Sequence, residues 1–168
     1  PAAPGAMLHT GSGWGCLERL RRSAHGEGAL SDWYDFPEST LTGCQMPWLK
    51  LLRDGRLESA DPMAAPEGYL VDRQWMEQLE KAMEEPENRS WFGWMHLGLM
   101  RYAHRDLPGA AAAFEESLAL ESSPWVFRNL AMLCGNEYGD YDKALEYMER
   151  SVQMEQNNRW LWLDLAVL

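Results

Sequence analysis

The sequence holds little cysteine and little histidine, and neither residue type forms a ligand pattern. Its three cysteines, Cys16, Cys44 and Cys134, are far apart and odd in number, so neither a disulfide framework nor a CxxC metal or redox pair is expected. The four histidines show no HExxH or comparable spacing, which argues against a zinc site. We therefore expect no metal and no cofactor. Unpaired thiols favour a reducing compartment, and we predict a cytoplasmic protein.

Positive charge and long apolar runs are also scarce. Lysine and arginine total 15 against 26 aspartate and glutamate, a formal net charge of −11. This balance disfavours nucleic acid as a partner, because phosphate binding needs clustered basic residues. No stretch of 18 uncharged apolar residues could cross a membrane. In contrast, 46% of the residues are hydrophobic and nine are tryptophan, so a packed core is expected, with one domain or one domain and a small flank.

Both ends of the sequence suggest a piece of a longer protein. The first residue is Pro1, with no signal-peptide pattern after it, and the last residues form an apolar run that ends at Leu168 without a helix-stop signal,. We expect that the chain is cut inside a helix. We also expect self-association through residues 159–168, since an apolar helix face without its second helix seeks a partner.

The second half of the sequence repeats itself. Residues 91–124 align with 125–158, and a third copy opens at 159–168,. Equivalent positions in the second part of each copy are 34 residues apart, for example Asp106 and Asp140. In the first part they are 33 apart, so one residue is inserted near 135–138. A helix, a turn and a second helix in each copy are predicted, with Asp106 and Asp140 as N-caps.

These copies resemble the tetratricopeptide repeat (TPR), a 34-residue helix–turn–helix unit. The pattern W-x2-L-G, then Ala, then Phe is matched in the first copy by Trp94, Leu97, Gly98, Ala110 and Phe114, and less closely in the second. The resemblance implies an all-α fold ending in a TPR-type α-solenoid. The expected parts are an irregular helical and loop segment (1–70), a capping helix and turn (71–90), and the repeats (91–168).

Three further helices are predicted before the repeats. Residues 71–86 carry an apolar stripe, with Asp72 as its cap and Pro86 as its end. Residues 45–53 and 14–25 form two shorter helices. In the helix 14–25, we expect the leucines to face inward and the arginines outward: Leu17 and Leu20 against Arg19, Arg21 and Arg22.

A second resemblance covers nearly the whole chain. It rests on the segments GSGWGCLE (11–18), FPEST (36–40), PWLKLL (47–52), DP (61–62), HLG (96–98) and RNLA (128–131). These segments are similar to those of large bacterial proteins of unknown function, which carry TPR repeats behind an N-terminal β-sandwich domain similar to mutarotases. The resemblance implies a parent protein connected with carbohydrate. It names no reaction.

The N-terminal loops offer one candidate site. The stretch 11–15 is rich in glycine but lacks the GxGxxG and Walker patterns, so we interpret it as a turn whose glycines permit positive φ. Aromatic rings and carboxylates cluster nearby, and such groups bind sugars or hydrolyse them. The alternative is that the rings are packing anchors and the acids solvated caps. The candidates for a sugar site are His9, Trp14, Glu18, Asp32 and Trp33, with Tyr34, Asp35 and Glu38 beside them.

The first helices of the repeats offer the other candidate. In TPR proteins, ligands lie against these helices, and the resemblance implies a peptide groove here. Its expected residues are Phe92, Met95, Leu99, Tyr102, Trp125, Arg128, Asn129 and Met132, followed by Trp160 and Leu163. A clamp for a peptide carboxylate is not supported, because Met95, Leu99 and Asp164 replace its lysines and asparagines. An apolar groove suits a hydrophobic peptide or a segment of the same polypeptide.

Two functions remain open from the sequence. The first is a non-catalytic interaction or scaffold module that binds a protein segment or another part of its own chain. The second is an accessory region of a carbohydrate-active enzyme, which adds loop residues to a sugar site on a β-sandwich domain. No catalytic residue is predicted within the chain itself.

Overall fold

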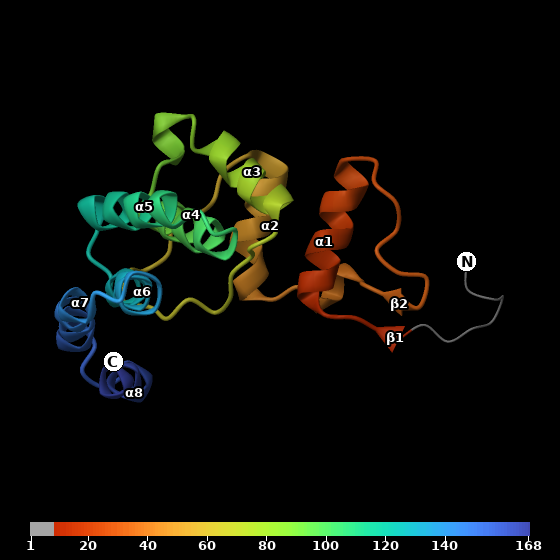
Figure 1. Cartoon of the computed structure of the whole chain (residues 1–168). Coiled ribbons are helices and arrows are strands. Elements are labelled where there is room, and N and C mark those ends of the chain that lie inside the picture. Colours follow the sequence, from red (N-terminus) through yellow and green to blue (C-terminus); the bar gives the residue numbers. More distant parts are fainter. Residues whose placement is uncertain (1–8) are drawn as a thin grey trace. The chain divides into compact units, whose positions relative to one another are not determined.

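The computed structural model describes residues 9–168 (Figure 1). Most of these residues are helical, in eight α-helices, and the strands among them are two short ones. The predicted all-α class is therefore confirmed. The chain divides into two compact units, one ending at Leu57 and the other beginning at Glu58. Residues 58–70, which the sequence analysis grouped with the N-terminal part, thus belong to the unit that holds the repeats. Each unit is described by itself.

The N-terminal unit contains helices α1 (Gly13–Ala24) and α2 (Met46–Asp54). The Ser12 hydroxyl accepts a hydrogen bond from the Gly15 backbone N–H and so caps α1, while a proline in the first turn favours the start of α2,. Strand β1 (His9–Thr10) pairs in parallel with β2 (Tyr34–Asp35). Short 3-10 turns at Glu38–Thr40 and Gly43–Gln45 lead into α2.

The glycines of the stretch 11–15 make room for an aromatic ring. A Cβ atom at Gly11 or Gly15 would overlap the ring of Phe36. None of the glycines in this stretch has a positive φ, so our interpretation of them as positive-φ turn residues is wrong. The Phe36 backbone is held there as well, because Arg19 Nε donates to its carbonyl oxygen at 2.9 Å. Close approach explains these glycines.

Arg21 is buried in α1, and our prediction that it faces outward is wrong. It is only 3% exposed. Its guanidinium donates two hydrogen bonds to Glu18 at 2.9 Å and two to Glu27 at 2.7 Å. These bonds hold the pKa of the Glu27 carboxyl below its ordinary value. A helical pattern assigns charged residues to the outside, but an arginine with two bidentate partners can be buried.

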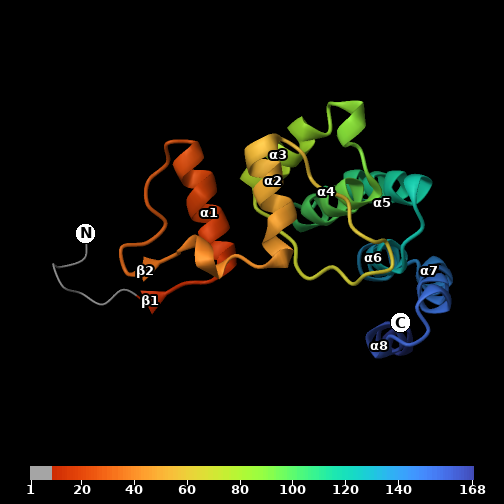
Figure 2. The same cartoon turned by 180° about the vertical axis from the view of Figure 1, so that it is seen from behind.

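In the C-terminal unit the helices pack against their neighbours in sequence order (Figures 1 and 2). Helix α4 (Trp91–Ala103) pairs with α5 (Leu107–Leu120), and α6 (Pro124–Leu133) pairs with α7 (Tyr141–Met154). Helix α8 (Arg159–Val167) packs against α7. Small residues are fully buried where the paired helices meet, which is the arrangement that close helix packing requires.

Helix α3 (Arg73–Ala82) packs against α4, with Trp75 and Leu79 buried. It is shorter than the predicted helix 71–86. Two side chains beyond its end cap it. Asn88 Nδ2 donates to the Ala82 carbonyl oxygen at 2.9 Å, and Arg89 Nε donates to that of Met83 at 3.0 Å. The last carbonyls of a helix need such partners. The helix therefore ends before Pro86.

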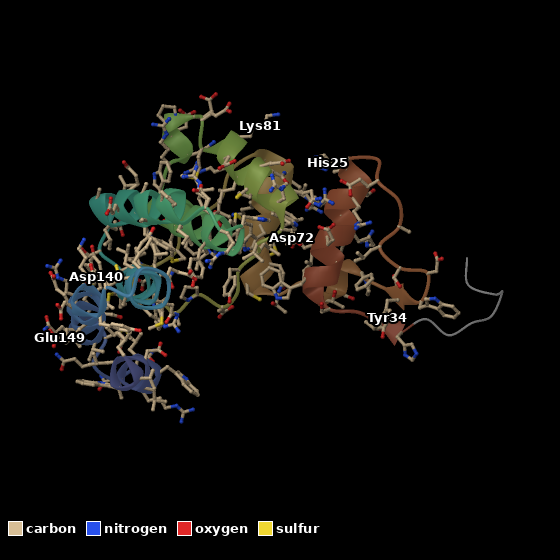
Figure 3. All side chains as sticks on the ribbon, viewed as in Figure 1. His25, Tyr34, Asp72, Lys81, Asp140 and Glu149 are labelled. Atoms are coloured by element: carbon tan, nitrogen blue, oxygen red, sulfur yellow. The ribbon has the colours of Figure 1, made fainter. Side chains whose placement is uncertain are left out.

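Both helix pairs have an aspartate as the N-cap of their second helix. Asp106 accepts a hydrogen bond from the Gly109 backbone N–H at 3.0 Å, and Asp140 accepts one from that of Lys143 at 3.2 Å. Asp140, labelled in Figure 3, immediately precedes α7. Both N-caps predicted for the two copies are thus confirmed, whereas Asp72 is the N-cap of α3 without a side-chain hydrogen bond.

In each pair, a buried hydrogen bond also joins the second helix to the first. The Ser117 hydroxyl of α5 donates to the Trp91 carbonyl oxygen of α4 at 2.7 Å. The Ser151 hydroxyl of α7 donates to the Pro124 carbonyl oxygen of α6, also at 2.7 Å. The serines are equivalent positions of the repeat, so similarity in sequence corresponds here to the same contact in space.

The residue inserted in the second copy has a visible consequence. Helix α6 continues into a π-helical turn over Cys134–Tyr138, where the sequence comparison placed the insertion. After α4, the Asp106 backbone N–H bonds to the Arg101 carbonyl, whereas after α6 the Asp140 N–H bonds to that of Cys134 and spans one residue more. A single extra residue in a helix is commonly taken up in this way.

Candidate functional site

An extended segment of the chain lies along the first helices of the repeats. We call residues 60–71 the strap. Figures 1 and 2 show this yellow segment reaching α6 and turning back before α3. Four of its backbone carbonyl groups accept hydrogen bonds from side chains of α4, α6 or the residues next to them. None of the candidate site residues predicted from the sequence lies in this segment.

The first part of the strap is bound near the starts of α4 and α6. Trp91 Nε1 donates to the Ala60 carbonyl oxygen at 3.0 Å, and the Ser123 hydroxyl donates to that of Pro62 at 2.9 Å. Trp125 Nε1 donates to that of Met63 at 3.3 Å. These donors are separated from their acceptors by 31 to 62 residues. Tertiary contacts, not local ones, therefore fix this segment.

A turn shapes the strap at this point. The Ala64 N–H donates to the Asp61 carbonyl oxygen at 3.0 Å, and the Asp61 carboxylate accepts from the Met63 N–H at 3.0 Å. Aspartate followed by proline favours such a turn, since the carboxylate accepts from a nearby N–H and proline presets φ. The strap then runs along α4 to its other end, where His104 Nε2 lies 2.8 Å from the Val71 carbonyl oxygen. A carbonyl can only accept, so this nitrogen is the donor.

Two hollows lie between the strap and the helices. The larger, of about 450 Å³, and the smaller, of about 370 Å³, share Tyr69 of the strap together with Leu99, Arg128 and Asn129. We call the surface that borders them the groove. The groove residues contributed by α4 and α6 are Leu99, Tyr102, Trp125, Arg128, Asn129 and Met132.

Charged partners surround this largely apolar surface. Arg128 Nε of α6 donates to Asp164 of α8 at 2.5 Å. The Tyr102 hydroxyl donates to Glu137 at 2.8 Å, and Arg105 donates to the same carboxylate oxygen at 2.7 Å. Burial and the bond to Glu137 raise the pKa of Tyr102, whereas the bond from Arg105 lowers the pKa of Glu137. The tyrosine therefore stays neutral and the glutamate stays charged at neutral pH.

Most of the predicted groove residues do meet at these hollows, but Phe92, Met95 and Leu163 do not. Phe92 and Met95 are buried, and Phe92 packs edge-on against the ring of His96 with their centroids 4.4 Å apart. Burial also lowers the pKa of His96 to about 3. Helix α8 contributes Trp160 and Asp164 to the smaller hollow, while Leu163 is exposed.

Several groove residues were not predicted from the sequence. Tyr69, Pro66 and Val71 come from the strap, and Asn136 comes from the π-helical turn. Nothing in the repeat pattern indicates a segment outside the repeats. The dipeptide Asp61-Pro62 is the one signal that could have placed a turn there.

The predicted sugar-site residues of the N-terminal unit have different surroundings from one another. Trp33 is 66% exposed and Tyr34 50% exposed, with Asp32 and Asp35 also exposed. Figure 3 shows Tyr34 at the strands of this unit, where its ring lies 5.8 Å from that of His9. Trp14 is half-buried in α1. Glu18 accepts hydrogen bonds from Arg21 and Arg22, so its carboxylate is held by two cations.

The described residues 9–168 contain no group of three His, Cys, Asp or Glu side chains that could hold a metal ion. Among the same residues, no helix has both the length and the apolar character needed to span a membrane. The three cysteines are free thiols, and burial raises the pKa of Cys134.

Comparison with known proteins gives no further assignment. Neither the protein-family models nor the curated proteins give a significant match to this chain. The groove and the exposed aromatic residues must therefore be interpreted from their own chemistry.

Proposed function

We propose that this chain is a non-catalytic protein-interaction module of the TPR type, whose groove binds a protein segment. The observation that carries the proposal is that equivalent residues of successive first helices border the same hollows. Leu99 of α4 and Met132 of α6 are 33 residues apart in the aligned copies, and both line the larger hollow. A surface built from repeated positions can extend along a peptide as further repeats are added.

The repeated contacts support the arrangement that we propose, a TPR-type solenoid whose third copy begins with α8. Both helix pairs have an aspartate cap and a serine that bonds the second helix to the first. In α8, Trp162, Leu165 and Ala166 occupy the positions of Trp94, Leu97 and Gly98 in α4. The groove would then continue onto α8 through Trp160, which lines the smaller hollow.

The chemistry of the groove favours binding. Its polar groups are an amide, a tyrosine that donates to a carboxylate, and an arginine paired with an aspartate. Apolar side chains with a few polar groups are typical of surfaces that bind peptides. We place the module in a larger bacterial cytoplasmic protein, with the free thiols as support for the compartment.

A peptide library tests the proposal. The 168-residue chain would be used to select 12-residue peptides, and the dissociation constants of the selected peptides would be measured by fluorescence anisotropy. Arg128→Ala should weaken binding at least about tenfold, which corresponds to about 1.4 kcal/mol.

Arg150→Ala is the matched control. Arg150 is also an arginine paired with an acid, Glu146 at 2.8 Å, but it does not line either hollow. Its replacement should leave the dissociation constant unchanged. Selection of no peptide, or equal losses in both variants, would contradict a peptide-binding groove.

One observation favours a second function. Trp33 and Tyr34 form an exposed aromatic surface beside the carboxylates of Asp32 and Asp35, and sugars commonly stack on such rings. The chain could then contribute to carbohydrate binding by a β-sandwich domain of the parent protein. Trp33→Ala in the full-length parent should abolish sugar binding, while Trp162→Ala, another half-exposed tryptophan, should not. Equal affinity of the parent and Trp33→Ala would remove this function.

The expected self-association through residues 159–168 stays a prediction. Helix α8 exposes Trp160, Trp162, Leu163 and Val167, and contiguous exposed apolar side chains mark sites of association. Sedimentation velocity at increasing concentration measures it. A monomer at all concentrations would contradict it.

A further inference from the structure

We propose that the strap is a replaceable occupant of the groove, and that an extended peptide of a partner protein binds in its place. The inference rests on the proposed function and adds the class of ligand and its regulation. The partner segment would contain a proline turn and would be recognised mainly through its backbone carbonyl groups. The intact chain is then a closed form of the module.

The strap is bound through its backbone. All four hydrogen bonds that tie it to the repeats end on its carbonyl oxygens, those of Ala60, Pro62, Met63 and Val71. Every peptide offers carbonyl groups, so these donors do not require the side chains of this particular segment. Affinity that comes from main-chain groups, with specificity from pockets beside them, is a known mode of peptide recognition.

Seven of the twelve residues of the strap are exposed, and its apolar residues Leu70 and Val71 are half-buried. Asp61, Met63, Glu67 and Tyr69 are exposed. Pro62 and Pro66 are half-buried, and their fixed φ lowers the entropy lost when the segment is ordered. A segment with a similar proline turn but larger apolar side chains would bind the same donors and bury more surface.

The groove has space for such side chains. The hollows of about 450 and 370 Å³ both border Tyr69. The strap residues Ala65 and Pro66, which also border the smaller hollow, have small side chains. Leu99, Met132 and Trp125 are apolar residues of the walls of these hollows. The strap therefore does not fill the surface that it covers, and the ligand class is an extended peptide with apolar side chains at these positions.

Covalent attachment explains why the strap occupies the groove in the free chain. A tethered segment has an effective concentration of about millimolar, so a free peptide at micromolar concentration competes poorly. The apparent affinity for a ligand equals the intrinsic affinity multiplied by the fraction of molecules in which the strap has left the groove. Removing the strap should consequently raise the affinity for a peptide added in solution.

The test compares the intact chain with a variant in which residues 60–71 are replaced by a Gly/Ser sequence of equal length. Such a linker loses more entropy on ordering and lacks the proline turn. The probe is a fluorescent peptide with the sequence of residues 58–72, and its binding is measured by anisotropy. We expect the replaced variant to bind the probe at least about tenfold more tightly than the intact chain.

A pair of tryptophan substitutions in the replaced variant identifies the site. Trp125→Phe removes the indole donor to Met63 and should weaken binding of the probe several-fold. Trp162→Phe removes an indole donor that bonds to Gln156 at 2.8 Å, away from the strap, and should leave binding unchanged. Equal effects of the two substitutions would overturn the assignment of the groove.

Two results would overturn the inference as a whole. One is equal binding of the probe by the intact chain and by a replaced variant with the same circular dichroism. The other is a replaced variant that does not fold, together with a folded Pro62→Gly/Pro66→Gly double variant that binds the probe no better than the intact chain. Library peptides that bind equally with and without the strap would leave the proposed function standing, whereas no binding to either form would remove both.

Discussion

The two helix pairs follow one design but differ in the residues that let their helices meet. In the first pair, Gly98 of α4 faces Phe114 of α5, and a Cβ atom at Gly98 would overlap the phenylalanine ring. In the second pair the same positions hold Ala131 and Met148, which are fully buried members of one cluster. A rigid ring requires glycine opposite it, while a flexible methionine accepts a methyl group. The size of each small residue is thus set by the side chain that packs against it.

The pairs differ at two further positions. His96 of α4 is buried, whereas its equivalent in α6, Asn129, is half-buried and borders the hollows. The residue before each capping aspartate has a left-handed backbone, but it is Arg105 (φ 64°) in the first pair and Gly139 (φ 65°) in the second. The conformation is thus kept while the residue type changes.

Overpacking the first pair should give the largest effect. Gly98→Leu forces a side chain into the Phe114 ring and should lower the free energy of unfolding by about 1–3 kcal/mol. Chemical denaturation measures it, and Ala112→Leu, at an exposed position of α5, is the control.

The pairing of residues across the helices can be tested with the same method. Gly98→Ala alone should destabilise the chain, and adding Phe114→Met should recover part of the loss by copying the second pair. If the change in the free energy of unfolding of the double variant equals the sum of the changes in the two single variants, these two residues do not act together.

Acid should destabilise the first pair through His96. Burial lowers the pKa of His96 to about 3, against 6.5 in the unfolded chain. As the pH falls, the unfolded chain therefore binds a proton before the folded chain does. The contribution of neutral His96 to the free energy of unfolding is present above pH 6.5 and is lost as the pH falls toward 3. We expect a loss of about 2 kcal/mol between pH 6.5 and pH 5 from this group.

Denaturation at several pH values measures this loss, and His96→Gln, which does not titrate in this range, should show a flatter profile. A parallel pH dependence in the two proteins would show that His96 is not the responsible group.

The two buried serines should be equivalent. Ser117→Ala and Ser151→Ala each leave a carbonyl group without its hydroxyl donor and should cost about 1 kcal/mol. Their effects should add, because the two contacts lie in different helix pairs and share no partner. Thermal melting of the single and double variants measures both. A much larger loss at one site would show that the repeats are not energetically alike.

The left-handed turn residues should give the smallest effect. Gly139→Ala places a Cβ in a conformation that disfavours it and should cost about 1 kcal/mol. Arg105→Gly relieves the same strain but removes the ion pair with Glu137, so the melting temperature should hardly change. A clear loss on Arg105→Gly would show that the ion pair outweighs the backbone strain.

Much of the repeat unit could be predicted because its signals are local. Asp106 and Asp140 cap helices through N–H groups three residues away, and the spacing of 33 against 34 residues located the π-helical turn. The site was less predictable. Leu99, Arg128 and Met132 were expected in the groove, but Phe92 and Met95 were expected there too and are buried. The pattern of one helix does not show which part of its face another segment covers.

The all-α class, the period of the repeats, their caps and the inserted residue follow from the sequence alone, since each depends on interactions within a few residues. The burial of Arg21 and the position of the strap in the groove depend on tertiary contacts. The strap is bound through backbone carbonyl groups, which every residue possesses. The position of the strap therefore does not follow from the pattern of side chains, because its contacts form only when distant parts of the chain meet.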